Sequence, residues 1–575
     1  MSFIFELGRH SAVLNFTAQY CESKAELLDS LGFEKILTSY LEKIEKRDTP
    51  IYQYLQAGRK LPINVLVKQM QQVFKLVIVM EPEEIISMKN EYSSYLSDHE
   101  EFLACIEEIY SYWRRLGRYA IAYNGRHQNG IQNTQFIETH ARFETLVLTT
   151  YRSVSEKIMG SKNKVYRQLI AGVNAGLVVN KMFYPLTDDV YFELFDIPII
   201  ESIVLHPPFI TYPTKNTRKG LFDEVFENPL TGLDINGQDF FCYPAKVGDL
   251  LALVFFHKDF MSQGVTLCNL FEMADIDEAM IRKPDLMYVY GADDGGKEET
   301  VFYKDEKNDM YIGYASYSEN IDYFGYMKKM ILTIHNVKML DIGALPLHGA
   351  MANIVMKNGE TKNIIIIGDS GAGKSETLEA LRSIGDTYIK DIKIIFDDMG
   401  VLSLNGEQLV AHGTEIGAFV RLDDLDVGYA YKEIDRSIFM NPDKINARIV
   451  IPVATYEEIT KKYPIDLFLY ANNYEDAEAI GFFENNGDAL KVFKSGARIA
   501  KGTTSEVGLV ETYFANPFGP VQRQAQTEIL LADYFERLEK STTKLGQIRT
   551  KLGIAGNEHT GPKSAAIALL EYLQK

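Results

Sequence analysis

The chain contains 575 residues, enough for two to four domains at roughly 150 residues per domain. Hydrophobic residues make up 46% and charged residues 24%, values typical of a folded globular protein, so a collagen-like, coiled-coil or wholly disordered chain is excluded. Asp and Glu number 79 against 60 Lys and Arg, and the resulting net charge of −19 argues against a nucleic-acid partner, because polyanions bind basic surfaces.

No apolar stretch reaches the roughly 20 residues that a membrane-spanning helix requires, and the first 16 residues lack the pattern of a secretory signal. The four cysteines, Cys21, Cys105, Cys242 and Cys268, are far apart and form no Cys-x-x-Cys pair. Free thiols in a reducing compartment are therefore expected. We predict a cytoplasmic protein without a membrane partner.

The first third of the chain has the spacing of amphipathic helices. Between Glu22 and Val154 apolar residues recur every three or four positions, for example Leu66, Met70 and Val73. One-sided apolar stripes of this kind are packing faces and carry no chemistry by themselves. The pattern predicts a helical N-terminal region, residues 1–195, of unassigned role.

After about residue 195 the sequence changes to short β-like runs separated by Gly, Pro and Asn, such as 199–205, 250–256 and 286–290. This texture predicts a mixed α/β body. We divide it into an α/β domain over residues 196–325 and a nucleotide-binding catalytic domain over residues 326–575. The predicted fold class is α/β in these two domains, or α+β for the whole chain.

The strongest motif is a phosphate-binding loop. Four isoleucines, 364–367, are followed by the pattern G-x-x-x-x-G-K-S and then by a helix-compatible run to Ile384. Glycines let the backbone wrap around phosphate oxygens, the helix start adds free N–H groups, the lysine adds charge, and the serine hydroxyl can bind Mg²⁺. The predicted nucleotide-binding residues are Gly368, Asp369, Ser370, Gly371, Ala372, Gly373, Lys374, Ser375 and Glu376.

Two further features flank this loop. Downstream, the apolar run 392–396 ends in the pair Asp397-Asp398, a candidate metal site because P-loop enzymes hold a metal at the end of a neighbouring strand. Upstream lie His348 and the pair Lys328-Lys329. Taken alone, the histidine is typical of a structural residue, and the lysines are typical of a solvated helix face.

Together these motifs resemble ATP-dependent phosphoenolpyruvate carboxykinase in type and order. Residues 323–329 read Tyr-Phe-Gly-Tyr-Met-Lys-Lys, and residues 347–353 read Leu-His-Gly-Ala-Met-Ala-Asn, followed by the P-loop and the aspartate pair. Residues 446–452, Asn-Ala-Arg-Ile-Val-Ile-Pro, and 497–504, Ala-Arg-Ile-Ala-Lys-Gly-Thr-Thr, are similar to later segments of that family. The resemblance covers roughly Ile199 to Lys575, and the helical first third lies outside it.

The resemblance implies a reaction in which oxaloacetate and ATP give phosphoenolpyruvate, CO₂ and ADP. The implied partners are thus ATP and this small substrate, with residues 196–325 on the substrate side. The implied Mn²⁺ ligands are Lys329, His348 and Asp398, and Lys329 is then expected to be buried and neutral. The residues implied for the nucleotide's Mg²⁺ are Ser375 and Asp397.

The same resemblance assigns the remaining site residues. Lys374 and Arg448 are implied to stabilise the transferring γ-phosphoryl group, and Tyr323 is implied to lie beside the substrate carboxylate. Arg218 stands where the family has its substrate loop. The residues implied at the nucleotide base are Thr503 and Thr504.

Other interpretations stay open, because the P-loop string Gly-Asp-Ser-Gly-Ala-Gly-Lys-Ser-Glu-Thr also resembles HPr kinase/phosphorylase, a protein-serine kinase. A second hypothesis is therefore a kinase for a protein serine or a small metabolite, with Asp397 or Asp398 as base. A third is a non-catalytic, nucleotide-regulated scaffold. The carboxykinase hypothesis predicts that Lys329, His348 and Asp398 converge close to the P-loop. The oligomeric state is left open.

Overall fold

The computed structural model describes residues 4–17, 21–123, 132–160, 170–181, 185–186, 188–216, 221–297, 299–422, 437–443, 447–500, 508–558 and 560–575. The chain divides into two units. The first comprises Met1–Lys181, Pro198–Phe209 and Lys258–Val265, and the second comprises Met182–Ile197, Ile210–His257 and Thr266–Lys575. Both contain helices and strands, so the predicted mixed α/β class is confirmed. The finer division at residues 195 and 325 stays a prediction.

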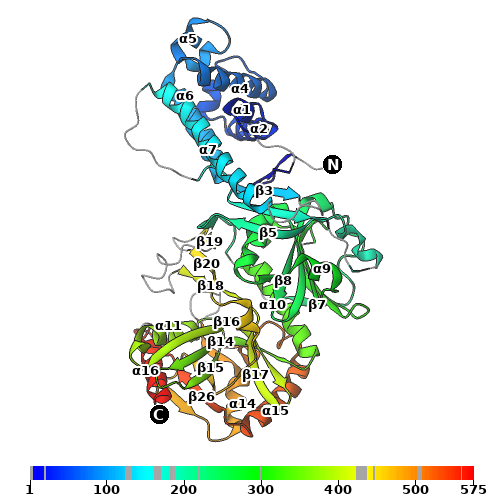
Figure 1. Ribbon diagram of the computed structural model, residues 1–575, viewed down its shortest axis with the longest axis vertical. Coiled ribbons are helices and arrows are strands. Elements are labelled where there is room, and N and C mark those ends of the chain that lie inside the picture. Colours follow the sequence, from blue (N-terminus) through cyan, green and yellow to red (C-terminus); the bar gives the residue numbers. More distant parts are fainter. Residues whose placement is uncertain are drawn as a thin grey trace. The chain divides into compact units, whose positions relative to one another are not determined.

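The helices of the first unit follow the predicted periodicity. They are α1 (Lys24–Asp29), α2 (Leu31–Lys46), α3 (Pro50–Gln56), α4 (Ile63–Val79), α5 (Pro82–Ser87), α6 (His99–Arg115), α7 (Gln132–Met159) and, mostly within this unit, α8 (Met261–Thr266). The side chains of Ser30 and Asp98 accept backbone N–H groups at the starts of α2 and α6. The stripe Leu66, Met70 and Val73 is fully buried, as an amphipathic packing face requires. Helices α4, α6 and α7 are labelled in Figure 1.

The first unit also contains strands that the helical interpretation did not include. They are β1 (Phe5–Leu7), β2 (Ser11–Asn15), β3 (Gly117–Tyr123), β4 (Ala175–Asn180) and β5 (Ile199–Leu205), paired in that order. Of these, only β5 was predicted. Every residue of β2 is buried, so the polar–apolar alternation that identifies a one-sided strand is missing there.

The second unit begins with a sheet in the order β8-β9-β11-β13-β12-β7, with β10 beside β8. The strands are β7 (Asp223–Val225), β8 (Phe240–Val247), β9 (Leu250–His257), β10 (Glu272–Met273), β11 (Leu286–Ala292), β12 (Thr300–Asp305) and β13 (Met310–Ser316). Helix α9 (Ile276–Ile281) follows β10, and α10 (Phe324–Asp341) packs against β11 and β13. Because α10 is buried almost all round, its Lys328-Lys329 pair is not a solvated face.

A second sheet of this unit has the order β21-β17-β16-β14-β15-β22-β26-β23. Its strands are β14 (Leu345–Met356), β15 (Thr361–Ile367), β16 (Ile389–Asn405), β17 (Gln408–Gly413), β21 (Tyr463–Pro464), β22 (Leu467–Asn472), β23 (Ile480–Phe482) and β26 (Lys544–Arg549). Strand β15 pairs antiparallel with β14 and parallel with β22. The motif-bearing strands β14, β15 and β16 are therefore neighbours.

Helices cover both faces of this sheet (Figure 1). They are α11 (Lys374–Ile384), α13 (Tyr456–Thr460), α14 (Asn486–Ser495), α15 (Gln524–Glu539) and α16 (Thr560–Leu573). Ile364 and Ile366 pack in one core with α11 and α16, whereas Ile365 and Ile367 pack in the other with α14 and α15. An uninterrupted isoleucine run is what a strand buried on both faces needs, and it holds the end of β15 rigidly.

Smaller strands complete the unit: β18 (Gly417–Arg421), β19 (Ser437–Met440) and β20 (Ala447–Pro452) are antiparallel, as are β24 (Ala497–Ile499) and β25 (Leu509–Glu511), and β6 (Phe209–Thr211) joins β19. One expectation was wrong. Asp397-Asp398 does not end its strand, because β16 continues to Asn405, held on its two sides by β14 and β17. Within the described residues, none of the helices has the length and apolar character needed to cross a bilayer.

Candidate active site

The P-loop has the predicted order of strand, loop and helix. Strand β15 ends at Ile367 and α11 begins at Lys374, so the predicted residues 368–376 form the connecting loop and the first turn of the helix. Gly371 and Gly373 have φ values of 80° and 91°, in the region that favours glycine. A Cβ atom on Gly373 would lie 2.6 Å from Cβ of Thr550, so this glycine also permits a close contact.

Three contacts from other elements hold the loop in shape. The N–H of Gly368 donates to the His348 carbonyl at 3.1 Å, the Asn473 amide donates to the Gly371 carbonyl at 3.0 Å, and the Thr550 hydroxyl donates to the Ala372 carbonyl at 2.6 Å. The first of these bonds uses a loop N–H group, and the other two occupy loop carbonyls. None of these roles was predicted.

Asp369 has a structural role within the loop. Its carboxylate accepts the N–H of Ser370 at 2.7 Å and the Thr512 hydroxyl at 3.0 Å, and it lies 3.0 Å from Nε of Arg498. The Asp369 side chain is buried. The Asp369 side chain thus ties the loop to β24 and to Thr512, next to β25.

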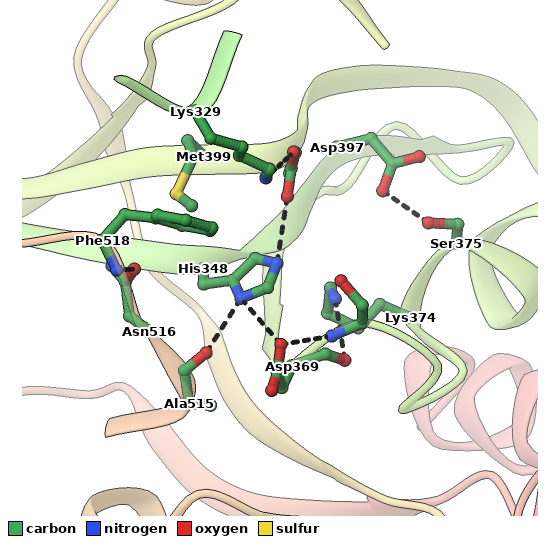
Figure 2. Close-up of polar contacts among 12 residues, drawn as sticks. Lys329, His348, Asp369, Lys374, Ser375, Asp397, Met399, Ala515, Asn516 and Phe518 are labelled. Carbon is green, nitrogen blue, oxygen red and sulfur yellow. Dashed lines mark hydrogen bonds and ion pairs between the residues drawn. The ribbon is translucent and has the colours of Figure 1, made fainter. Parts of the chain in front are cut away.

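Lys374 and Ser375 follow the loop as the motif predicts (Figure 2). Nζ of Lys374 donates to the Asp369 carbonyl at 3.3 Å, and the Ser375 hydroxyl donates to Oδ1 of Asp397 at 2.7 Å. Burial raises the pKa of the Asp397 carboxyl, and the hydroxyl of Ser375 and the charge of Lys374 only partly offset it. The paired Ser375 and Asp397 oxygens are hard donors of the kind that Mg²⁺ prefers.

Asp398 is the centre of a buried polar cluster. Its Oδ2 lies 2.6 Å from Nζ of Lys329 and 2.7 Å from Nζ of Lys328, and its Oδ1 lies 3.0 Å from Nε2 of His348. Burial alone would raise the pKa of this carboxyl, but the two ammonium groups outweigh burial and hold the pKa well below its usual range. Lys329 and His348 therefore both contact Asp398, as predicted. Asp398 is adjacent in sequence to Asp397, the hydrogen-bond partner of Ser375.

His348 is oriented by the backbone on its other side. Its Nδ1 lies 2.8 Å from the Ala515 carbonyl and donates to it (Figure 2). Its Nε2 lies 3.0 Å from Oδ1 of Asp398. Burial and the charge of Lys374 lower the pKa of the imidazole, and the neighbouring Asp398 only partly offsets this effect. Phe514 and Ala515 adopt φ values of 54° and 52°, unusual for residues other than glycine, and such local strain is typical of functional sites.

Lys329 lies between a carboxylate and an aromatic ring. Besides its contact with Asp398, its Nζ is 4.6 Å from the centroid of the Phe518 ring. Burial lowers the pKa of Lys329 to about 8. The charge of Lys328 also lowers it, and the charge of Asp398 partly raises it. The side chain is 15% exposed, so it does not point freely into solvent.

Tyr323 and Arg448 form a separate pair. The Arg448 guanidinium lies 5.8 Å from the centroid of the Tyr323 ring and 5.2 Å from that of Phe419. The ring of Tyr323 lies against Gly325, where a Cβ atom would be 2.1 Å from a ring carbon, which explains the glycine of the Tyr-Phe-Gly-Tyr motif. Three predicted residues, Arg218, Thr503 and Thr504, lie outside the described residues.

Sequence reasoning missed several residues of the cluster. They are Glu415, Ala515 and Phe518, together with Lys328 in its buried role; Arg498, the partner of Asp369, was also missed. Nζ of Lys328 lies 2.8 Å from Oε1 of Glu415, and both side chains are almost completely buried. The available signal for Glu415 was a single carboxylate within the largely apolar stretch 409–420.

The donor set at Asp398 fits a divalent transition metal. It offers an imidazole whose other nitrogen is fixed by a carbonyl, a carboxylate, and an amine whose lowered pKa makes its neutral form accessible. Among the described residues no three His, Cys, Asp or Glu side chains gather as a metal site, so the set depends on Lys329 as its third donor.

Neither a family model nor a curated protein matches the chain.

Proposed function

We propose that the chain is an ATP-dependent phosphoenolpyruvate carboxykinase-like enzyme, with a carboxykinase-type catalytic domain, that converts oxaloacetate and ATP to phosphoenolpyruvate, CO₂ and ADP. One observation carries the proposal: Lys329 and His348 meet at Asp398, directly next to the P-loop partner Asp397. A kinase for a hydroxyl acceptor needs a base and Mg²⁺, and it gives no reason for a lysine of lowered pKa in this place.

The phosphoryl half of the reaction depends on the P-loop. The N–H groups of the first turn of α11 would bind the phosphates, because α11 has no side-chain cap at its start. Ser375 and Asp397 would hold Mg²⁺, which neutralises phosphate charge when bound. Lys374 adds a fixed positive charge, and Arg448 is proposed as a second cation for the transferred group.

The decarboxylation half depends on the cluster at Asp398. Lys329, His348 and Asp398 would hold Mn²⁺, which when bound supplies Lewis-acid polarisation of a carbonyl oxygen. Lys329 contributes a lone pair once it has lost its proton, and the Ala515 carbonyl keeps the Nε2 lone pair of His348 directed at the same place. Tyr323 is proposed to lie beside the substrate carboxylate.

The proposed chemistry is balanced without a further reactant. The bond between the departing carboxylate and the adjacent CH₂ carbon breaks, its electron pair forms the enolate, and the enolate oxygen attacks the γ-phosphorus as ADP leaves. Lys329, His348 and Asp398 would hold the cation beside the enolate oxygen, where its positive charge would stabilise the negative charge, and the P-loop groups would stabilise negative charge on the phosphoryl group.

The test is phosphoenolpyruvate formation by the purified full chain from oxaloacetate and ATP with Mn²⁺ and Mg²⁺. Wild type is expected to be active. Lys329→Met is expected to lose phosphoenolpyruvate formation and still bind a fluorescent ATP analogue, and Lys374→Ala is expected to lose turnover. A wild-type protein that binds the ATP analogue and forms no phosphoenolpyruvate would refute the proposal. Phosphorylation of a protein serine would then favour the HPr-kinase-like alternative.

A further inference from the structure

We infer that Glu415 is a positioning residue for the cation site at Asp398: it serves as the counter-ion of Lys328 and thereby leaves Asp398 available to a divalent cation. The inference rests on the proposed cation site. It starts from the two adjacent lysines of α10, whose ammonium groups both contact the single oxygen Oδ2 of Asp398.

Lys328 is the more deeply buried of the two lysines. Its side chain is completely buried, and Glu415, at 2% exposure, is its second carboxylate partner at 2.8 Å. Burying an unpaired ammonium is far more costly than burying a paired one, so Lys328 must keep a carboxylate beside it. Among the described residues, Asp398 and Glu415 are the carboxylates in ion-pair contact with it.

A divalent cation changes the demand on Asp398. When a cation is held by Asp398, His348 and Lys329, the carboxylate charge of Asp398 is shared with that cation. Lys328 then needs a second negative charge, and Glu415 supplies it. With Glu415 neutral, Lys328 would bind Asp398 more strongly and compete with the cation for it.

The backbone holds Glu415 in this position. It lies between β17 and β18, where the Thr414 hydroxyl donates to the Met399 carbonyl at 3.0 Å and the N–H of Ile416 donates to the Leu270 carbonyl at 2.9 Å. Gly417 follows, where a Cβ atom would lie 2.0 Å from the Asn269 carbonyl oxygen. This segment is thus fixed on both sides of Glu415, and it has little freedom to withdraw the carboxylate from Lys328.

The variant Glu415→Gln tests the inference, because it removes the charge and keeps the shape. Mn²⁺ binding is measured by the electron paramagnetic resonance signal of free Mn²⁺ in titrations of the full chain. Residues that support metal ligands typically change affinity 10-fold to 100-fold, so Glu415→Gln is expected to weaken Mn²⁺ binding by at least about tenfold. Glu415→Asp, which keeps the charge, is expected to recover part of the affinity.

Two controls separate a local effect from a loss of fold. Glu407→Gln makes the same chemical change at an exposed position in the turn between β16 and β17 and is expected to bind Mn²⁺ as wild type does. Binding of a fluorescent ATP analogue at the P-loop is expected to be unchanged in Glu415→Gln, a readout that general misfolding would lower.

The outcomes distinguish this inference from the proposed function. Wild-type Mn²⁺ affinity in Glu415→Gln would overturn the inference and leave the cation site standing. Equal losses of Mn²⁺ and nucleotide binding would also overturn it, because Glu415 would then support the fold in general. A wild-type chain that binds no Mn²⁺ at all would overturn the cation site and, with it, both proposals.

Discussion

The adjacent lysines Lys328 and Lys329 are predicted to differ sharply in their effect on stability. Replacing Lys328 by Met leaves Glu415 buried without an ion-pair partner among the described residues. Removing one partner of a buried pair costs about 3–5 kcal/mol, which is a large part of the 5–15 kcal/mol that stabilises a typical protein. Lys328→Met is therefore expected to lower the free energy of unfolding by about 3–5 kcal/mol.

Lys329→Met has a different expected result. Asp398 keeps Lys328 at 2.7 Å and His348 at 3.0 Å, so no carboxylate is left unpaired. The desolvation penalty of the Lys329 ammonium disappears, and the thioether can pack against the ring of Phe518, a contact worth about 0.3–1.5 kcal/mol. The net change is expected to stay within about 1 kcal/mol, although Mn²⁺ binding is lost.

Urea unfolding followed by circular dichroism measures both variants. With a urea dependence of about 3 kcal/mol per molar, Lys328→Met moves the midpoint of the second unit's transition down by about 1 M or more, and Lys329→Met leaves it nearly unchanged. Lys491→Met, at a lysine that is 80% exposed, is the matched control and is expected to cost less than about 1 kcal/mol. The double variant Lys328→Met/Glu415→Leu should regain most of the stability lost in Lys328→Met. Equal losses in the two single variants would refute the reasoning.

The remaining predictions concern the P-loop and a buried histidine. Gly373 has a φ of 91°, and a Cβ atom there would lie 2.6 Å from Thr550, so Gly373→Ala should weaken binding of an ATP analogue at least tenfold. Gly406 has a φ of 63° and open space around it, so Gly406→Ala should cost only about 1 kcal/mol of stability and leave nucleotide binding unchanged. Burial lowers the pKa of His335 to about 4. Below pH 6.5 this histidine is therefore protonated in the unfolded chain and neutral in the folded chain, and stability falls as the pH drops from 6.5 towards 4. Between pH 7 and 5.5 this histidine alone should cost about 1 kcal/mol by linkage, and urea unfolding of His335→Gln should show a correspondingly smaller loss than wild type. An identical pH dependence in the two proteins would contradict this assignment.

The local parts of the site could be predicted from sequence. A P-loop is a contiguous string in which each residue type has one physical task, so the positions of Lys374 and Ser375 followed from the motif. The buried isoleucine strand before it was equally readable, because a run of β-branched residues bounded by glycine is typical of a central strand. The Lys329, His348 and Asp398 cluster came from the resemblance to a family.

The rest depended on contacts between distant segments. Glu415 and Lys328 are far apart in the sequence, so no local pattern predicts their ion pair. The Ala515 carbonyl orients His348 through a backbone conformation that the local sequence Ala-Asn-Pro-Phe does not predict. The prediction that this strand ends at Asp398 was wrong. An acidic pair tends to end a strand, but β16 has 17 residues and pairs with both β14 and β17, and this pairing outweighs the local tendency.

The most direct measurement of the central claim follows phosphorus by nuclear magnetic resonance in a mixture of the purified chain, ATP, oxaloacetate, Mg²⁺ and Mn²⁺. We expect the γ-phosphate signal of ATP to be replaced by that of phosphoenolpyruvate, in an amount equal to the ADP formed, and we expect Lys329→Met to abolish this conversion. Formation of ADP with inorganic phosphate and no phosphoenolpyruvate would contradict this expectation.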